Sequence, residues 1–182
     1  YAELGNGYLR EKALDDRIGC AIMVDILNKD LPYDVTCVFT VQEEIGTRGA
    51  KVAAYTVKPD YAIVLETTTA CDFSGNDGEK RVCELGKGCV VSYMDRSTIY
   101  DRELYRLGFE KAKEINVPCQ TKTLVAGGND SGAIHSSVGG IRTVALSVPC
   151  RYLHSSSCMI KKSDVQSTAE LAYAMYLALA EK

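Results

Sequence analysis

The stretch FTVQEEIGTRGA, residues 39–50, decides the fold of this chain. Residues 34–42 (DVTCVFTVQ), which overlap its start, form a short apolar and β-branched run, typical of an interior strand in a covered sheet. The glycine-punctuated turn that follows leads into a helix expected over residues 47–57. Glu43 and Glu44 are therefore predicted at the carboxyl end of a buried strand, where open α/β sheets place their ligand sites.

Adjacent carboxylates repel each other, so this pair lowers stability unless a cation or a shared proton offsets the repulsion. Two surface acids in a solvated loop are the ordinary interpretation of such a pair taken alone. Three other candidate side chains lie at or just beyond the ends of further expected strands: Asp15, Glu66 and His154. Because the carboxyl ends of parallel strands meet at one sheet edge, we expect them to lie beside the glutamate pair.

Strands alternate with helices along the rest of the chain. The expected strands cover residues 8–14, 34–42, 60–65, 89–93, 120–125 and 141–148, and the expected helices cover residues 17–28, 47–57, 100–116 and 163–180. Asp16 is expected to cap the first helix, and Ser163 with Gln166 resembles a capping box at the last. This order predicts one α/β domain, a three-layer α/β/α sandwich with a largely parallel or mixed sheet.

The composition of the chain argues against nucleic-acid and membrane partners and indicates the state of its cysteines. The net charge of −3, without any basic run, argues against nucleic-acid binding. The longest apolar stretches are too short to cross a bilayer and no signal-peptide pattern opens the chain, so no membrane partner is expected. Eight cysteines without a CxxC pair predict reduced thiols in a cytoplasmic protein, with Cys20, Cys37 and Cys89 in the core.

The acids at the strand ends predict a metal centre. Asp15, Glu43, Glu44 and Glu66 would not converge in one crevice without cations, and two divalent metal ions would neutralise them. Zinc and cobalt also favour a nitrogen ligand, which His154 offers beyond the last core strand.

Three motifs, KALDDRIGC, FTVQEEIGTRGA and SVPCRYLHS, resemble those of the zinc/cobalt aminopeptidases of metallopeptidase family forty-two. That family includes glutamyl aminopeptidase and the tetrahedral (TET) aminopeptidases, and the resemblance runs along nearly the whole chain. It implies a zinc-exopeptidase-like fold and a metal-dependent aminopeptidase. Such an enzyme removes N-terminal residues from peptides with a free N-terminus, using two zinc or cobalt ions in each active site.

The resemblance also implies a role for each candidate residue. Asp15 matches the carboxylate that bridges both metals, and its peptide bond to the next residue is expected to be cis. Glu43 matches the general base that acts on the attacking water. Glu44 and His154 match ligands of one metal. Glu66 matches a ligand of the other, at a position where the family usually has aspartate.

Part of the family pattern is absent from the sequence. The family takes one further metal ligand from an upstream HxD motif, followed by an inserted dimerisation domain, and this chain contains no HxD. Residues 1–182 are therefore expected to form the C-terminal portion of a catalytic domain. We expect at most one tightly held metal, weak or absent activity, and oligomers only in a full-length parent. His135, the other histidine, does not match the family motif.

Three other interpretations were weighed. A glycoside hydrolase also needs two carboxylates, but adjacent residues are poorly placed to flank a sugar. A catalytically silent structural or interaction fragment is the alternative from another class. The segment NDSG resembles a serine-protease signature, yet both histidines follow Ser131 instead of preceding it. Asp130 in this segment is interpreted as an acid that lines the site or orders a loop.

Overall fold

A mixed four-stranded sheet forms the centre of the molecule. A computed structural model describes residues 1–182, except for the side chain of Glu79. The sheet order is β3-β6-β4-β5, with β3 (Tyr61–Thr69), β6 (Arg142–Cys150), β4 (Cys89–Val91) and β5 (Cys119–Thr121). β3 and β6 run parallel along their whole length, whereas β4 is antiparallel to β6 and parallel to β5.

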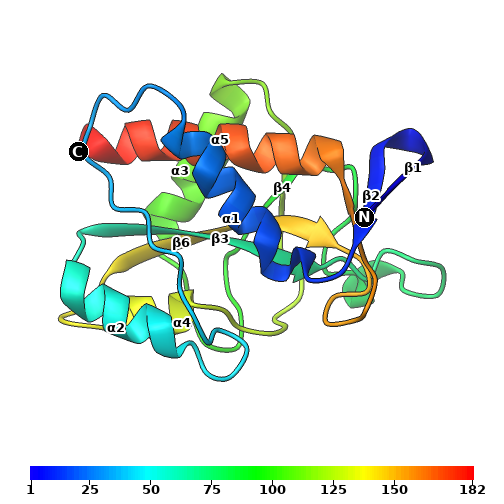
Figure 1. The fold of residues 1–182 in the computed structure, drawn as a ribbon, viewed down its shortest axis with the longest axis horizontal. Helices are drawn as coiled ribbons and strands as arrows, with labels where there is room; N and C mark the ends of the chain where they lie inside the picture. The colour runs from blue at the N-terminus through cyan, green and yellow to red at the C-terminus, as the bar shows by residue number, and fades with distance from the viewer.

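Helices cover both faces of this sheet (Figure 1). One face carries α1 (Leu14–Leu27), α3 (Arg102–Glu114) and α5 (Lys162–Ala180), and the other carries α2 (Arg48–Val57) and α4 (Ser131–His135). The predicted three-layer α/β/α sandwich is therefore confirmed. Within the described residues, every helix is too short or too polar to span a bilayer.

A small antiparallel sheet pairs the first strands of the chain with the strand that precedes the last helix. It consists of β1 (Ala2–Leu4), β2 (Tyr8–Glu11) and β7 (Cys158–Lys161), with a short 3-10 turn, Gly5–Gly7, between the first two. β2 leads into α1, and the loop between β6 and β7 returns beside it. This pairing brings the start of α1 next to the loop that carries His154.

The main core lies between the sheet and the helices α1, α3 and α5. Its largest fully buried side chains include Leu104, Leu146, Ile160, Leu171 and Met175. Each such side chain contributes about 1.5–3 kcal/mol when fully removed from water. β6 is buried along all but its first residue, which explains why its continuous apolar run was recognisable as a covered strand.

The prediction of a buried strand over residues 34–42 is wrong. This segment is irregular, and Val35, Phe39 and Val41 are 41%, 47% and 66% exposed. In the described part of the chain, residues 34–40 make no backbone–backbone hydrogen bond. A β-branched segment becomes a strand only when a neighbouring strand offers backbone partners, and none of the described strands pairs with this one.

Smaller predictions were also wrong. β3 continues to Thr69, so Glu66 lies inside the strand instead of closing it, and β5 is shorter than expected. The capping box at Ser163 is not formed, because Lys161 precedes α5 without a side-chain cap. Cys20 is exposed on α1, whereas Cys89 is buried as predicted.

Candidate metal centre

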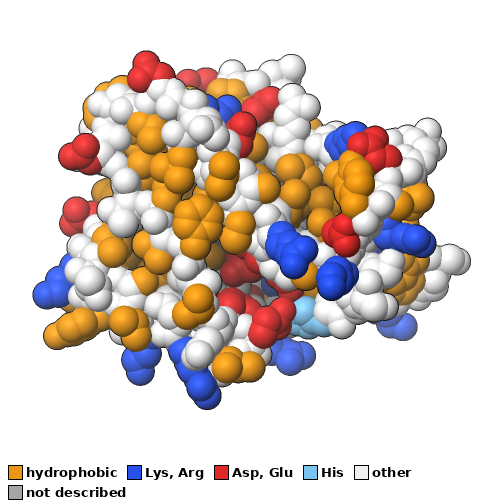
Figure 2. All heavy atoms as spheres, viewed as in Figure 1, with side chains coloured by type: hydrophobic (Ala, Val, Ile, Leu, Met, Phe, Trp, Pro, Cys, Tyr) orange, Lys and Arg blue, Asp and Glu red, His pale blue; other side chains and the backbone are white. Residues whose placement is uncertain are grey.

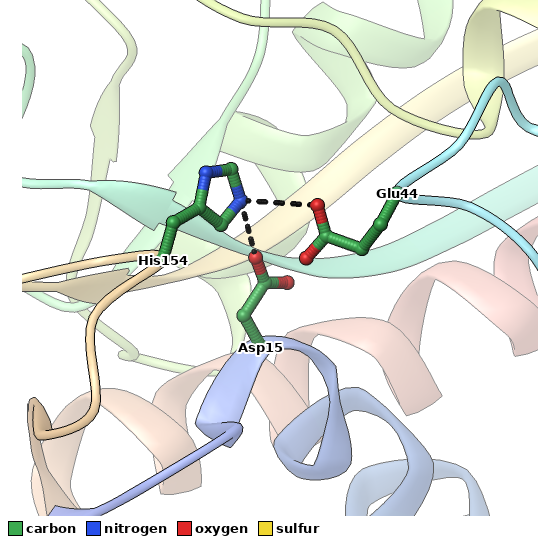
Figure 3. A group of neighbouring side chains, drawn as sticks. All are labelled: Asp15, Glu44 and His154. Carbon is green, nitrogen blue, oxygen red and sulfur yellow. Dashed lines mark ion pairs between the residues drawn. The ribbon is translucent and has the colours of Figure 1, made fainter.

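Side chains from three distant parts of the chain meet at one edge of the sheet (Figure 3). His154 Nε2 lies 3.1 Å from Asp15 Oδ2 and 3.4 Å from Glu44 Oε2. The Asp15 side chain is mostly buried at 15% exposure, whereas those of Glu44 and His154 are 59% and 61% exposed. One nitrogen and two carboxylates, two of the three side chains being exposed to solvent, match the three-ligand set of catalytic zinc sites, which leave a position open to water.

The start of α1 presents two aspartates in non-helical backbone conformations. The peptide bond between Asp15 and Asp16 is cis, as predicted. Asp16 Oδ1 accepts a hydrogen bond from the Gly19 amide at 3.1 Å, so the expected capping role is also present. A side chain at position 19 would collide with the Asp16 carboxylate and displace it from its present position.

A second group of acids shares Asp15. Asp15, Asp16 and Glu66 each place one carboxylate oxygen within 4.8 Å of the others, and Glu66 is only 7% exposed. The sequence did not point to Asp16 as part of this group, because its helix cap already explained it. All donors in this second group are oxygens, so it lacks the nitrogen donor that zinc and cobalt favour.

The pKa values of Glu66 and Asp16 show that negative charge is unfavourable in the second group. Burial, followed by repulsion from Asp16, raises the pKa of Glu66 to about 10. Burial also raises the pKa of Asp16 to about 8, although the Gly19 amide acts in the opposite direction. Acids held this close need protons or a cation. The donor set thus fits divalent metal ions. Figure 2 shows acidic side chains around a hollow with a histidine at its rim.

Glu43 sits in a turn that is tied to the start of α2. The amides of Gly46 and Thr47 donate to the Glu43 carbonyl at 3.0 and 2.9 Å, and the Gly49 amide donates to the Val41 carbonyl at 3.0 Å. Burial, then the charges of nearby carboxylates, raises the pKa of Glu43 to about 7. Its side chain lines a pocket of about 920 Å³ between α2 and α4.

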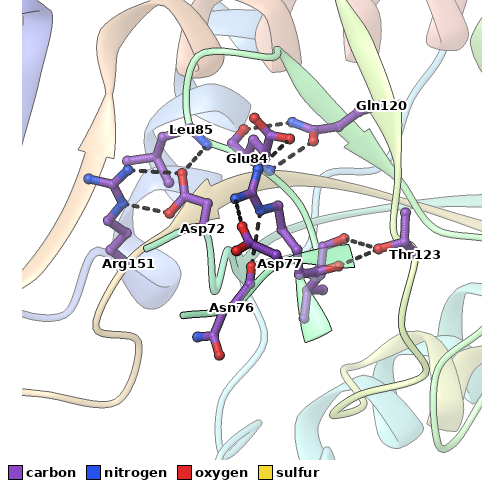
Figure 4. A network of polar contacts seen from close by, with 10 residues as sticks. Asp72, Asn76, Asp77, Glu84, Leu85, Gln120, Thr123 and Arg151 are labelled. Atoms are coloured by element: carbon purple, nitrogen blue, oxygen red, sulfur yellow. Dashed lines mark hydrogen bonds and ion pairs between the residues drawn. The ribbon is translucent and has the colours of Figure 1, made fainter. Parts of the chain in front are cut away.

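The loop that carries His154 is held at its base by a partly buried ion pair between Arg151 and Asp72 (Figure 4). Arg151 donates to both carboxylate oxygens of Asp72 at 2.6 and 3.0 Å, and the Leu85 amide donates to the same carboxylate at 2.9 Å. Burial acts to raise the pKa of Asp72, but these hydrogen bonds hold it below its ordinary value. Arg151 also exchanges two backbone hydrogen bonds with Met159 across the loop.

The remaining candidates, His135, Ser131 and Asp130, belong to neither group of possible metal ligands. The His135 ring Nδ1 is 2.8 Å from the Ser131 carbonyl, and His135 belongs to neither of the acidic groups found among the described residues. The Ser131 hydroxyl is buried and has no hydrogen-bond partner among these residues, so no serine-protease arrangement is formed. Asp130 accepts a hydrogen bond from the Thr40 hydroxyl at 2.6 Å, in agreement with a loop-ordering role.

The fold and the site together define a three-layer α/β/α domain with an acidic, histidine-bearing centre at one sheet edge. The chain belongs to the M42 glutamyl aminopeptidase family, whose sequence profile matches residues 1–171. Among its relatives is the lysyl aminopeptidase of Pyrococcus furiosus. The two sequences are 35% identical over 165 residues, which is 89% of this chain and 46% of that protein.

Solved structures show the same architecture. An aminopeptidase of the archaeon Desulfurococcus kamchatkensis matches with a TM-score of 0.92 and 28% identity, over 100% of this chain and 54% of that one. The TET1 peptidase of Pyrococcus horikoshii, described as assembling into a tetrahedron or an octahedral shell, matches with a TM-score of 0.82 and 31% identity. That match covers 96% of this chain and 52% of the other. The chain thus spans about half the length of these proteins.

Proposed function

We propose that this chain forms the metal-binding and water-activating part of an aminopeptidase that removes N-terminal residues from peptides. The observation that carries the proposal is the position of Asp15. Its carboxylate belongs both to the Glu44–His154 group and to the Asp16–Glu66 group. A carboxylate shared by two such groups is what two neighbouring divalent ions need as a bridge.

Each group would hold one ion. Asp15, Glu44 and His154 would bind zinc or cobalt in the first position, and Asp15 with Glu66, beside Asp16, would bind in the second. When bound, the ions lower the pKa of a coordinated water and polarise the scissile carbonyl group. The buried carboxylates of the second group would release their protons on binding, because a cation replaces the proton as the stabilising partner.

Glu43 is the proposed general base. It stands next to the ligand Glu44 but belongs to neither ligand group, so its carboxylate stays available for proton transfer. In the metal-free chain, burial and the neighbouring carboxylates raise its pKa to about 7. A carboxylate placed beside a coordinated water can take a proton from it and return the proton to the leaving amine. The adjoining pocket gives a peptide room to approach this carboxylate.

The second group is incomplete within residues 1–182. We propose that the chain is the C-terminal portion of a catalytic domain, and that a polypeptide segment outside it supplies the missing nitrogen ligand. Two observations support this. The relatives are about twice as long, and residues 34–40 make no backbone–backbone hydrogen bond within the described part of the chain, so another strand could pair with them. Alone, the chain would hold one metal tightly and turn over peptides weakly. The complete protein would form oligomers, as the TET1 peptidase does.

Calorimetric titration of the metal-free chain with zinc tests the proposal. We expect one tight site, which His154→Ala and Glu44→Gln abolish and Glu43→Gln leaves intact. His135→Ala is the matched control, because His135 belongs to neither group. Tight binding that survives His154→Ala would contradict the proposed ligands. No binding by the native chain would contradict the centre itself and favour a catalytically silent fragment.

A further inference from the structure

The segment that leads to the glutamate pair has few attachments to the rest of the molecule. Its beginning is held at Tyr33, whose amide donates to the Tyr176 hydroxyl at 3.0 Å and whose carbonyl accepts from it at 2.6 Å. Beyond Tyr33, residues 34–40 make no backbone–backbone hydrogen bond within the described part of the chain. The apolar side chains of this segment are also largely exposed, so packing holds it weakly.

One side-chain hydrogen bond attaches this segment to the rest of the molecule. Thr40 Oγ1 donates to Asp130 Oδ2 at 2.6 Å, a short distance typical of a hydroxyl that donates to a carboxylate. Asp130 is only 5% exposed and lies immediately before α4, which contacts both β6 and α2. The contact therefore connects an exposed segment to a buried residue of the helical layer beneath it.

This contact lies three residues before Glu43. From Val41 onward the chain is tied to α2, through the Val41, Gln42 and Glu43 carbonyls. The turn that carries the proposed base and ligand is thus held on one side by α2 and on the other by Asp130. Without the second attachment, residues 34–40 would have no hydrogen bond to the body of the molecule among the described residues.

We propose that Asp130 is a positioning residue which, through Thr40, fixes the turn that carries Glu43 and Glu44. The inference rests on the proposed metal centre and assigns a further residue to it. Asp130 would neither bind the metal nor touch the substrate. Outer partners of metal ligands typically change metal affinity by about 10–100-fold when they are removed, because they hold the ligands in the binding geometry.

Variants at the two ends of the contact test the proposal through zinc affinity. Thr40→Val removes the hydroxyl and keeps the shape, and should weaken zinc binding by about 10–100-fold. Thr40→Ser keeps the hydroxyl and should bind zinc within about twofold of the native chain. Asp130→Asn keeps an acceptor oxygen but removes the charge, and should weaken binding less than Thr40→Val does. Circular dichroism shows whether each variant is folded.

Hydrogen exchange of the amides of residues 41–47 gives a readout that does not depend on metal. Thr40→Val should speed their exchange at least tenfold, while exchange in α5 stays unchanged and Thr40→Ser behaves as the native chain does. If the native chain binds no zinc, the proposed metal centre fails and this exchange still decides the role of the contact. Native exchange or native affinity in Thr40→Val would overturn the positioning role. A larger loss in Asp130→Asn than in Thr40→Val would do so too, because it would show that Asp130 acts through its charge.

Discussion

The buried acids predict that the metal-free chain loses stability as pH rises from 5 to 7. Burial raises the pKa of Asp16 from 3.8 to about 8 and that of Glu66 from 4.5 to about 10. In this range both groups hold a proton in the folded chain and are ionised in the unfolded chain. The folded chain therefore binds more protons, and the free energy of unfolding falls with rising pH.

The size of the effect follows from the number of groups. Each group of this kind lowers the free energy of unfolding by about 1.4 kcal/mol per pH unit. Asp16 and Glu66 together give a loss of at most about 5 kcal/mol over these two pH units, because they also repel each other. For a chain of this length, that corresponds to a drop of about 10–20 °C in Tm. The decline should continue to about pH 8, where Asp16 ionises in the folded chain, and then become shallower.

Thermal unfolding in a chelator, followed by circular dichroism at a series of pH values, measures this slope. Glu66→Gln should lower the slope by about a third to a half, because the amide does not titrate whereas Asp16 and Glu43 still do. Saturating cobalt should raise the Tm throughout the series, because a ligand that binds only the folded chain stabilises it. Carboxylates with lowered pKa values, such as Asp72 and Asp101, lose their stabilising effect only at lower pH. A Tm that is constant or rises between pH 5 and 7 without metal would refute the reasoning.

Three substitutions give further predictions. Glu43→Gln should leave metal affinity within about threefold of native and lower hydrolysis by about 10²–10⁴-fold in the complete enzyme, measured with an aminoacyl anilide. Asp72→Asn should lower the free energy of unfolding by about 2–3 kcal/mol in urea titration, because Arg151 loses a buried charged partner. Gly49→Ala should destabilise by about 1–3 kcal/mol, although alanine usually favours helices, because its Cβ would lie 2.5 Å from the Val41 carbonyl oxygen. Native stability in either structural variant would contradict these contacts.

The layers of the fold were predictable because they depend on local patterns. The continuous apolar run of β6 and the helical spacing in α3 and α5 are visible in the sequence and match the observed elements closely. The antiparallel sheet was missed in part, because strands as short as β1 and β7 carry too few residues for a clear alternation. The segment over residues 34–42 was mispredicted because pairing depends on a neighbour, which a local pattern does not reveal.

The site was predictable where a residue had no other explanation. Asp15 had no local structural role and His154 follows the strand β6, whereas the strand expected before Glu44 is not formed. The structure nevertheless brings the three side chains together. Asp16 was set aside because its hydrogen bond to the Gly19 amide already explained an aspartate at a helix start. Only the three-dimensional arrangement shows that the Asp16 carboxylate also belongs to an acidic group.

Anomalous diffraction from crystals grown with cobalt tests the metal centre most directly. Data collected on both sides of the cobalt absorption edge locate the ion without any assumption about its ligands. We predict one strong peak within about 2.0–2.2 Å of Asp15, Glu44 and His154, and a weaker peak or none beside Glu66. An absence of density between those three residues at saturating cobalt, or a strong peak bound elsewhere, would contradict the proposed centre.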